Sequence, residues 1–166
     1  MDVFNEQMVK KRPTTRDTLL KIGIVLLSTV LALVFVLSIP TIGLLIACAI
    51  IFGGYVLVGR LNKEYEYALT NGELDIDIIY NRSSRKRVFT GLIKDFEMMS
   101  PLNSPENQSV FSTASERHDY SSGVAADKAY IFLAHHKGKK IAVIIEPNEE
   151  LLEAISKFMP RSKFKK

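Results

Sequence analysis

The residue types of a hydrolytic triad lie close together once in this sequence, at His118, Asp119, Ser121 and Ser122. Such a triad combines a serine nucleophile, a histidine base and a carboxylate that orients the base. Catalysis requires the base to lie within about 3 Å of the nucleophile. The surrounding stretch, residues 100–128, is rich in Ser, Asn, Asp and Pro, so we do not expect it to hold that geometry.

The remaining histidines, the cysteine and the glycine pair do not form a metal or phosphate site. His135 and His136 are consecutive in an apolar run that predicts a strand, so their side chains should point to opposite faces. Cys48 is the only cysteine, which excludes an intrachain disulfide and a two-cysteine metal site. Gly53 and Gly54 lie inside an apolar segment rather than a phosphate-binding loop. We therefore expect no enzyme activity, no metal and no cofactor.

Basic side chains form the one cluster with binding chemistry, and two interpretations of it are open. They could bind anionic lipid headgroups or an acidic partner surface, or they could neutralise Asp75 and Asp77 on a neighbouring strand. The second role is the commoner one for charges on a folded surface. The candidate contact residues are Arg60, Lys63, Arg82, Arg85, Lys86 and Arg87.

The net charge of +4 is unevenly distributed along the 166 residues. Residues 1–63 hold seven bases against three acids, whereas bases and acids balance in residues 64–166. The excess brackets an uncharged apolar run at residues 22–58 and forms no stripe on the polar part. We therefore expect the anionic inner leaflet of a membrane as the counter-charge, and no nucleic acid.

The apolar run predicts two transmembrane helices, at residues 22–39 and 42–58, joined at Pro40-Thr41. Each is long enough to cross a hydrocarbon core of about 30 Å with help from the interfaces. Bases flank both outer ends and are absent from the turn, so both chain termini are expected in the cytoplasm. The short spans leave a re-entrant hairpin as the alternative.

Small residues recur four apart in both spans, which favours close helix packing. The two helices packing on each other is the preferred interpretation, and a homo-oligomer is the alternative. The residues are Ser28 and Ala32 in the first span, and Gly43, Ala47, Ala49 and Gly53 in the second.

The segment before the first span, residues 1–18, is expected in the cytoplasm as a short amphipathic helix at the headgroups. Val3, Phe4, Met8 and Val9 recur at helical intervals there. A helix start is expected at Thr14 or Thr15 with Asp17, so the two-helix hairpin as a whole occupies residues 19–59.

Residues 64–80 predict a β-hairpin with a type I′ turn at Asn71-Gly72. Its apolar face carries alternate residues from Tyr65 to Ile78. The other face pairs Glu66 with Asp77, and these acids need bases from a neighbouring strand.

Further strands are expected at residues 85–92 and 93–99, followed by a flexible loop at residues 100–128 that holds at most one short edge strand. Val110, Phe111 and Tyr120 are its only apolar anchors. A second, central hairpin is predicted at residues 129–135 and 140–146 around Lys137-Gly138.

The last predicted element is an amphipathic helix, capped by Asn148 and ended by Pro160. A basic tail, residues 161–166, follows and is expected to fray. The fold class is a membrane helical hairpin plus an α+β domain at residues 62–160. That domain is an antiparallel sheet or barrel of six or seven strands with a C-terminal helix.

This strand order, with the turn Leu69-Thr70-Asn71-Gly72-Glu73-Leu74 soon after two spans, resembles the bacterial pleckstrin-homology-like domains found beside membrane helices. The likeness covers about residues 60–160. The whole chain, from MDVFNEQMVKKRPTTRDTLLK to IIEPNEELLEAISKFMP, also resembles a family of small two-pass bacterial membrane proteins. Eukaryotic relatives bind phosphoinositides through bases in a strand connection. Here the bases at residues 82–87 lie in the second connection, and that motif is not reproduced.

Two functions remain open on these grounds. The leading one is a membrane-anchored, non-catalytic interaction module that presents its domain to lipid or to an unknown membrane or cytosolic protein. The basic turn, the polar loop and any uncovered sheet edge are its candidate surfaces. The alternative is an accessory subunit of a transporter, channel or envelope complex, bound through its helical hairpin.

Overall fold

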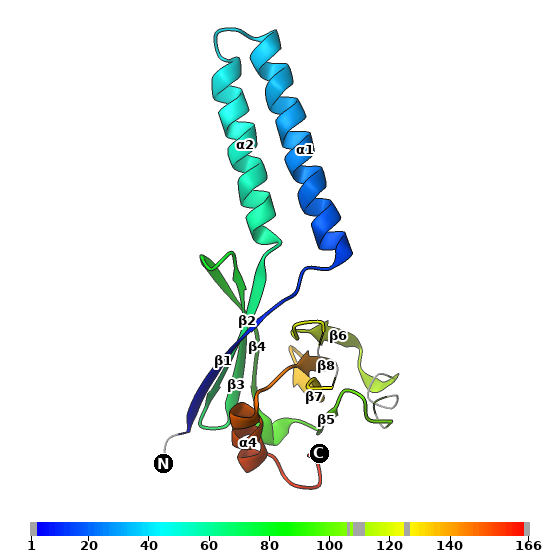
Figure 1. Ribbon diagram of the computed structural model, residues 1–166. Coiled ribbons are helices and arrows are strands. Elements are labelled where there is room, and N and C mark those ends of the chain that lie inside the picture. The colour runs from blue at the N-terminus through cyan, green and yellow to red at the C-terminus, as the bar shows by residue number, and fades with distance from the viewer. Residues whose placement is uncertain (1–2, 106, 108–111, 125–126, 165–166) are drawn as a thin grey trace. The chain divides into compact units, whose positions relative to one another are not determined.

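The computed structural model describes residues 3–105, 107, 112–124 and 127–164 (Figure 1). The chain forms two compact units. The helical unit comprises residues 13–63 together with the short turn at residues 80–84. The sheet domain comprises the described parts of residues 1–12, 64–79 and 85–166.

Two antiparallel helices make up most of the helical unit, α1 (Thr15–Ser38) and α2 (Gly43–Arg60). The chain turns between them at Pro40, as the sequence predicts. Thr14 caps α1 in a capping box: its side chain accepts from the Asp17 backbone N–H, and the Asp17 carboxylate accepts from the Thr14 N–H. Both helices are long and apolar enough to cross a membrane.

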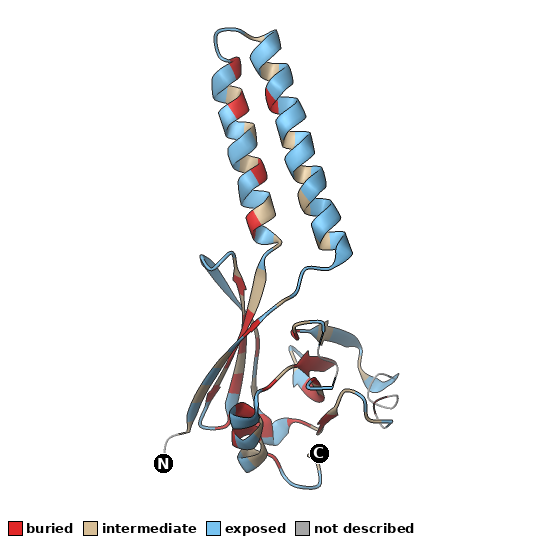
Figure 2. Ribbon diagram, in the orientation of Figure 1, coloured by how far each residue is buried: buried red, intermediate tan, exposed pale blue. Residues whose placement is uncertain are grey.

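Most apolar side chains of α1 and α2 are exposed within the unit (Figure 2). Only 6% of the most apolar 18-residue stretch of α1 is buried, and only 17% of the corresponding stretch of α2. The core helix of a water-soluble protein would bury its apolar side chains against other elements. These helices are instead apolar all round, which fits a surrounding of lipid.

The first sheet has the strand order β1-β2-β3-β4. Its strands are β1 (Phe4–Lys10), β2 (Lys63–Thr70), β3 (Glu73–Tyr80) and β4 (Ser84–Leu92). Strands β2 and β3 form the expected hairpin, with Asn71 and Gly72 both at positive φ (49° and 88°) as a type I′ turn requires.

The prediction of an amphipathic helix before the first span is wrong, because residues 4–10 form strand β1. β1 pairs antiparallel with β2, with Val9 opposite Tyr65 and Lys10 opposite Glu64. Val9 lies in the core whereas Phe4 and Met8 are exposed on the other face, which is the alternation of a strand. The domain predicted at residues 62–160 is therefore incomplete, because its first sheet also contains a strand from before α1.

The second sheet has the order β5-β7-β8-β6. Its strands are β5 (Met98–Pro101), β6 (Glu116–Asp119), β7 (Tyr130–His136) and β8 (Lys139–Ile145). The β7–β8 hairpin is central, as predicted, and β6 is the one short edge strand expected in the polar loop. β6 runs parallel to β8, whereas β5 and β7 pair antiparallel to their neighbours.

Three other expectations need correction. The strand expected at residues 93–99 is divided into a 3₁₀ turn, η1 (Ile93–Asp95), and the start of β5. The described residues hold eight strands in two open four-stranded sheets, one of them with a parallel pair, rather than six or seven antiparallel strands in one sheet or barrel. The tail is bound as far as Phe164: Met99 donates to the Lys163 carbonyl, and the Phe164 ring stacks on Tyr130. Val110 and Phe111 lie outside the described residues.

The main core of the sheet domain contains residues of both sheets and of helix α4 (Glu149–Phe158). Phe96 and Phe132 stack there with ring centroids 4.3 Å apart, and Leu151 and Ile155 of α4 are fully buried. Asn148 caps α4 by accepting from the Leu151 N–H, as predicted. A smaller cluster on the other face of the second sheet includes Ile131 and Ile144.

Candidate membrane-interface site

The structure divides the predicted basic cluster into two groups with different surroundings. Arg85 and Arg87 lie in β4 beside the acids of β2 and β3. Arg85 forms an ion pair with Glu66 and lies 3.9 Å from Asp77. Lys86 lies between the two arginines in β4, and the other three members belong to the helical unit: Arg60, Lys63 and Arg82.

Arg87 bridges the two aspartates of β3. Its Nε lies 2.8 Å from Asp77 Oδ1, and its Nη1 lies 2.6 Å from Asp75 Oδ2. Thr90 donates to the other Asp75 oxygen at 2.7 Å. These contacts support the neutralising role for Arg85 and Arg87, and they show that both guanidinium groups are already engaged by carboxylates.

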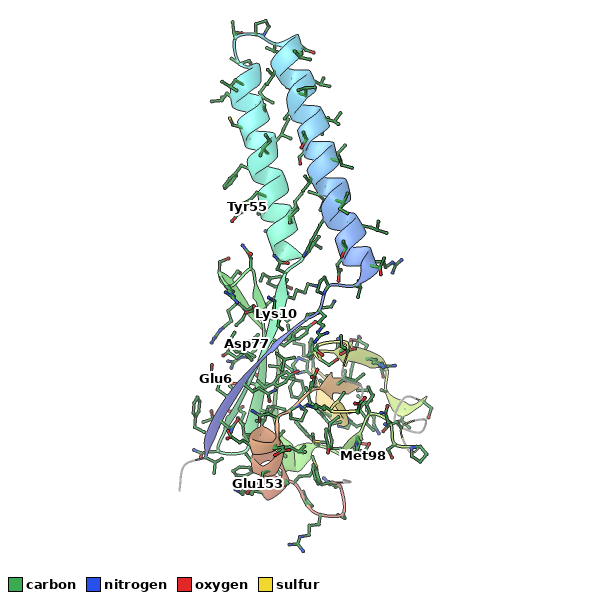
Figure 3. All side chains as sticks on the ribbon, in the orientation of Figure 1. Glu6, Lys10, Tyr55, Asp77, Met98 and Glu153 are labelled. Atoms are coloured by element: carbon green, nitrogen blue, oxygen red, sulfur yellow. The ribbon has the colours of Figure 1, made fainter. Side chains whose placement is uncertain are left out.

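Burial explains why the carboxylates need these bases. The side chains of Glu66 and Asp77 are each only 5% exposed, although they lie on the face of the sheet opposite the main core. Burial raises the pKa of Glu66, and the positive charge of Arg85 opposes that rise. The hydrogen bond to Asp77 raises the pKa of Arg87. The labels of Glu6 and Asp77 in Figure 3 mark this face of the sheet.

Lys86 lies between the two arginines and has different surroundings. It is exposed and forms no ion pair with any residue that the structure describes. Of the three consecutive bases in β4, Lys86 therefore has the charge most accessible to an external anion.

The second group of bases lies around the C-terminal end of α2, within the helical unit. The turn at residues 80–84 bonds to that end, since the Asn81 N–H donates to the Asn62 carbonyl at 2.9 Å. The Lys63 ammonium lies 5.7 Å from the Tyr80 ring centroid, and Lys21 of α1 donates to the Asn62 side chain at 2.7 Å.

The backbone conformation of the turn at residues 80–84 determines the position of Arg82. Asn81 and Arg82 both have positive φ, 48° and 56°, and the Ser83 N–H closes the turn on the Tyr80 carbonyl at 3.0 Å. Gly59 lies against this turn, because a Cβ there would be 3.2 Å from the Asn81 side chain. The sequence does not reveal the roles of Gly59, Lys21 and Asn62. Their contacts join residues that are about 20 to 40 positions apart, so no local pattern indicates them.

The charge of the helical unit is one-sided. It contains one acid, Asp17, and this carboxylate caps α1. A surplus of this size beside two apolar helices matches the surface of an anionic leaflet. The bases of the unit are Arg16, Lys21, Arg60, Lys63 and Arg82.

The predicted helix-packing residues do not all face the partner helix. Gly43, Ala47 and Ala32 are buried, and Ser28 lies beside Gly54, which the sequence analysis did not single out. The remaining pair of α2, Ala49 and Gly53, faces elsewhere: Ala49 is exposed, and no atom lies within 4 Å of a Cβ placed on Gly53.

The Gly43→Ala substitution should weaken the hairpin by about 2 kcal/mol, because overpacking a close contact costs about 1–3 kcal/mol. The added Cβ would lie 2.2 Å from the Phe35 carbonyl oxygen. Gly53→Ala is the matched control, since it adds the same methyl group to open space. The measurement is loss of the far-ultraviolet helical signal during titration with a denaturing detergent. Equal midpoints for the two variants would contradict the packing described above.

The residues of the possible Ser-His-Asp triad do not form a catalytic arrangement. Ser121 Oγ donates to Asp119 Oδ1 at 2.7 Å, whereas His118 Nε2 lies 3.4 Å from Glu116 and its ring stacks on Tyr120. His135 lies near Glu97 and His136 near Phe89, so these two histidines face different surroundings. In the part of the chain that the structure describes, no group of His, Cys, Asp or Glu could hold a metal ion.

A comparison with known families gives one match, over residues 1–165, to a family described as bacterial PH-like domain (DUF6106). This match includes both apolar helices as well as the two sheets and α4. The comparisons with curated proteins and with solved structures gave no match. With two apolar helices, two sheets and a closing helix along almost its whole length, the chain belongs to this family of bacterial PH-like domains.

Proposed function

We propose that this protein is a membrane-anchored, non-catalytic interaction module that presents a PH-like domain at the cytoplasmic surface of the bacterial membrane. The pairing of β1 with β2 carries this proposal. β1 ends before α1 and β2 begins after α2, and Lys10 and Glu64 are opposite each other in the sheet. Both ends of the hairpin therefore join one folded body, which requires them to be on the same side of the membrane.

Charge supports the cytoplasmic side. Lys10, Lys11 and Arg12 precede α1 and Arg60 ends α2, whereas residues 39–42 at the other end carry no base. Positive charge next to a span favours retention in the cytoplasm.

Topology reporters provide the test of this placement. Reporters fused at residue 1 and residue 166 should both give a cytoplasmic signal. The Thr41→Cys variant, in a chain with Cys48→Ser, should react with a membrane-impermeant thiol reagent added outside the cell. Absence of labelling in this variant would favour the re-entrant hairpin. An extracellular signal from either terminus would overturn the proposal.

The face of the first sheet opposite the core is the surface that we propose for a protein partner. Phe4 is 67% exposed and Met8 is 56% exposed on this face, with Glu6 between them on β1 and Ala68 of β2 opposite Glu6. Large apolar side chains exposed on one face of an edge strand favour an interaction surface. Acids surround them, including Glu6 and Glu73, so the partner should combine apolar and basic side chains.

One observation favours the alternative, an accessory subunit bound through its helices. Ala49 and Gly53 are small, lie four residues apart and do not pack on α1, which leaves them available to a helix of another protein.

A chain without the hairpin separates the two functions. The expected partner surface needs β1, so a truncation that begins at residue 62 would remove an edge strand. Arg12 should instead be joined to Lys63 through a short glycine-rich linker. If this chain still captures the partner from membranes, the interaction module is supported. If only the isolated helical hairpin captures it, the accessory subunit is supported.

A further inference from the structure

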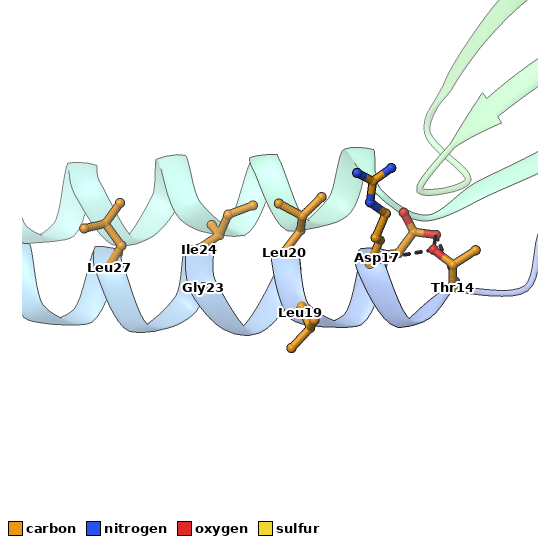
Figure 4. Close-up of a pocket in the computed structure, with 8 residues that line it drawn as sticks. Thr14, Asp17, Leu19, Leu20, Gly23, Ile24 and Leu27 are labelled. Atoms are coloured by element: carbon orange, nitrogen blue, oxygen red, sulfur yellow. Dashed lines mark hydrogen bonds between the residues drawn. The ribbon is translucent and has the colours of Figure 1, made fainter.

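A shallow, largely open apolar groove, lined by residues of α1 and its cap alone, follows this helix from its N-terminus into the predicted hydrocarbon region (Figure 4). Its volume is about 830 Å³. The polar end is formed by the first turn of the helix and the apolar end by the next three turns. The lining residues are Thr14, Arg16, Asp17, Leu19, Leu20, Gly23, Ile24 and Leu27.

Gly23 makes the middle of this groove. No heavy atom lies within 4 Å of a Cβ placed on Gly23, so the groove is open at that level. Leu20 is 55% exposed and Leu27 is 62% exposed on either side of it. A missing side chain between two exposed leucines leaves a notch whose walls are aliphatic, which suits a hydrocarbon chain.

The polar end carries two opposite charges, and the Asp17 carboxylate is engaged by Thr14 in the helix cap, which leaves Arg16 as the group that faces outward. The dashed lines in Figure 4 join Thr14 and Asp17, whose side chains bond to each other in the cap. Arg16 itself is exposed and forms no ion pair with any residue that the structure describes. A guanidinium group of this kind is suited to bidentate bonding of a phosphate.

The distance between the two ends matches an amphiphile. Arg16 and Gly23 are separated by seven positions, or about 10 Å along the helix axis. The uncharged run begins at residue 22, so the polar end lies outside the hydrocarbon and Gly23 lies inside it. The positive surplus of the helical unit then selects for an anionic headgroup.

We propose that this groove binds one anionic phospholipid of the inner leaflet, with the phosphate at Arg16 and an acyl chain across Gly23. The site rests on the membrane placement proposed above. It differs from the general attraction of a basic surface for lipid, because it requires the open notch at Gly23 as well as the charge.

Native mass spectrometry of the full chain, purified in a mild detergent, tests this proposal. The probes are phosphatidylglycerol and phosphatidylcholine added at equal concentration. The wild-type chain should prefer phosphatidylglycerol, and Arg16→Gln should reduce that preference about fivefold, because it removes a charge-assisted bond to phosphate. Gly23→Leu should lower the binding of both lipids about tenfold, because it fills the notch.

Gly53→Leu is the matched control, since it also replaces an open glycine in a span but lies outside the groove. It should bind lipid as the wild-type chain does. Equal lipid binding by the Gly23→Leu and Gly53→Leu variants would overturn the site, and an unchanged preference in Arg16→Gln would overturn the phosphate position. Carbonate extraction of all four chains distinguishes this failure from failure of the membrane placement, because a chain without the lipid site should still stay in the membrane.

Discussion

Replacing Val9 with asparagine should destabilise the sheet domain by about 3 kcal/mol, whereas the same change at the neighbouring Met8 should stay within about 0.5 kcal/mol. Val9 is 7% exposed and packs in the main core, while Met8 is 56% exposed on the opposite face. A buried, unpaired amide has no compensating partner, whereas an exposed one remains hydrated. The two substitutions should therefore differ by an amount that matters in a domain whose total stability is about 5–15 kcal/mol.

Thermal unfolding of the full chain in detergent, followed by the near-ultraviolet circular dichroism of the aromatic core, measures this difference. An amphipathic helix would place Met8 and Val9 on the same side, and both substitutions would then have similar effects. Similar loss in both variants would thus contradict the strand.

The Arg85→Ala substitution should cost the sheet domain about 3 kcal/mol at neutral pH. The cost arises from the Glu66 carboxylate, which is 5% exposed and would lose its ion-pair partner. This cost is at the lower limit of the range for breaking a buried ion pair, because Arg85 itself is 57% exposed and its charge is partly screened by solvent. Lys86→Gln, which removes a neighbouring charge that forms no ion pair with a described residue, is the control and should stay within about 0.5 kcal/mol.

A second substitution separates the ion pair from loss of packing. Glu66→Gln removes the buried charge, so the Arg85→Ala/Glu66→Gln chain should recover most of the lost stability. Failure of Glu66→Gln to rescue would show that the aliphatic part of Arg85, and not its charge, stabilises the sheet.

The pH dependence follows from the raised pKa of Glu66. A carboxyl group whose pKa is higher in the folded than in the unfolded state binds its proton more tightly when folded. Its burial therefore costs stability above the folded-state pKa, and the cost is relieved as the pH falls through that value. Removing Arg85 raises the pKa of Glu66 further, so the destabilisation of Arg85→Ala should shrink as the pH is lowered. The double variant should not show this effect.

Local signals predicted the elements whose contacts are close in sequence. Asn71-Gly72 fixed the first hairpin, because these residues tolerate positive φ, and Asn148 fixed the start of α4. Lys137-Gly138 marked the second hairpin in the same way, with φ of 50° and 75°. The two spans followed from the absence of charge alone.

The missed elements depend on contacts that are distant in sequence. Residues 4–10 fit a helical period nearly as well as a strand, and only the pairing of Lys10 with Glu64 decides between them. The β4 register was open for a similar reason: Arg87 faces Asp75, and Thr90 reaches the same carboxylate, while Phe89 between them is in the core. The half-buried and buried positions of β4 thus depart from strict alternation, and the register could not be read from the sequence.

The sequence predicted a cluster of basic residues, and the structure divides these residues between strand β4 and the helical unit. The acids of β2 and β3 already called for bases on the next strand, so the role of Arg85 and Arg87 could be inferred from charge pairing. Arg60, Lys63 and Arg82 come together only because the turn at residues 80–84 bonds to the end of α2. The lipid groove depends on the open space at Gly23, which a sequence does not contain.

The position of β1 has a consequence for how this protein is made. β1 leaves the ribosome before its partner β2, which is translated about fifty residues later, after the whole apolar hairpin. β1 therefore stays unpaired until the whole hairpin has been translated. With the hairpin in the bilayer as proposed, completion of the domain depends on insertion, and a chain whose hairpin fails to insert would expose an incomplete sheet to cellular proteases.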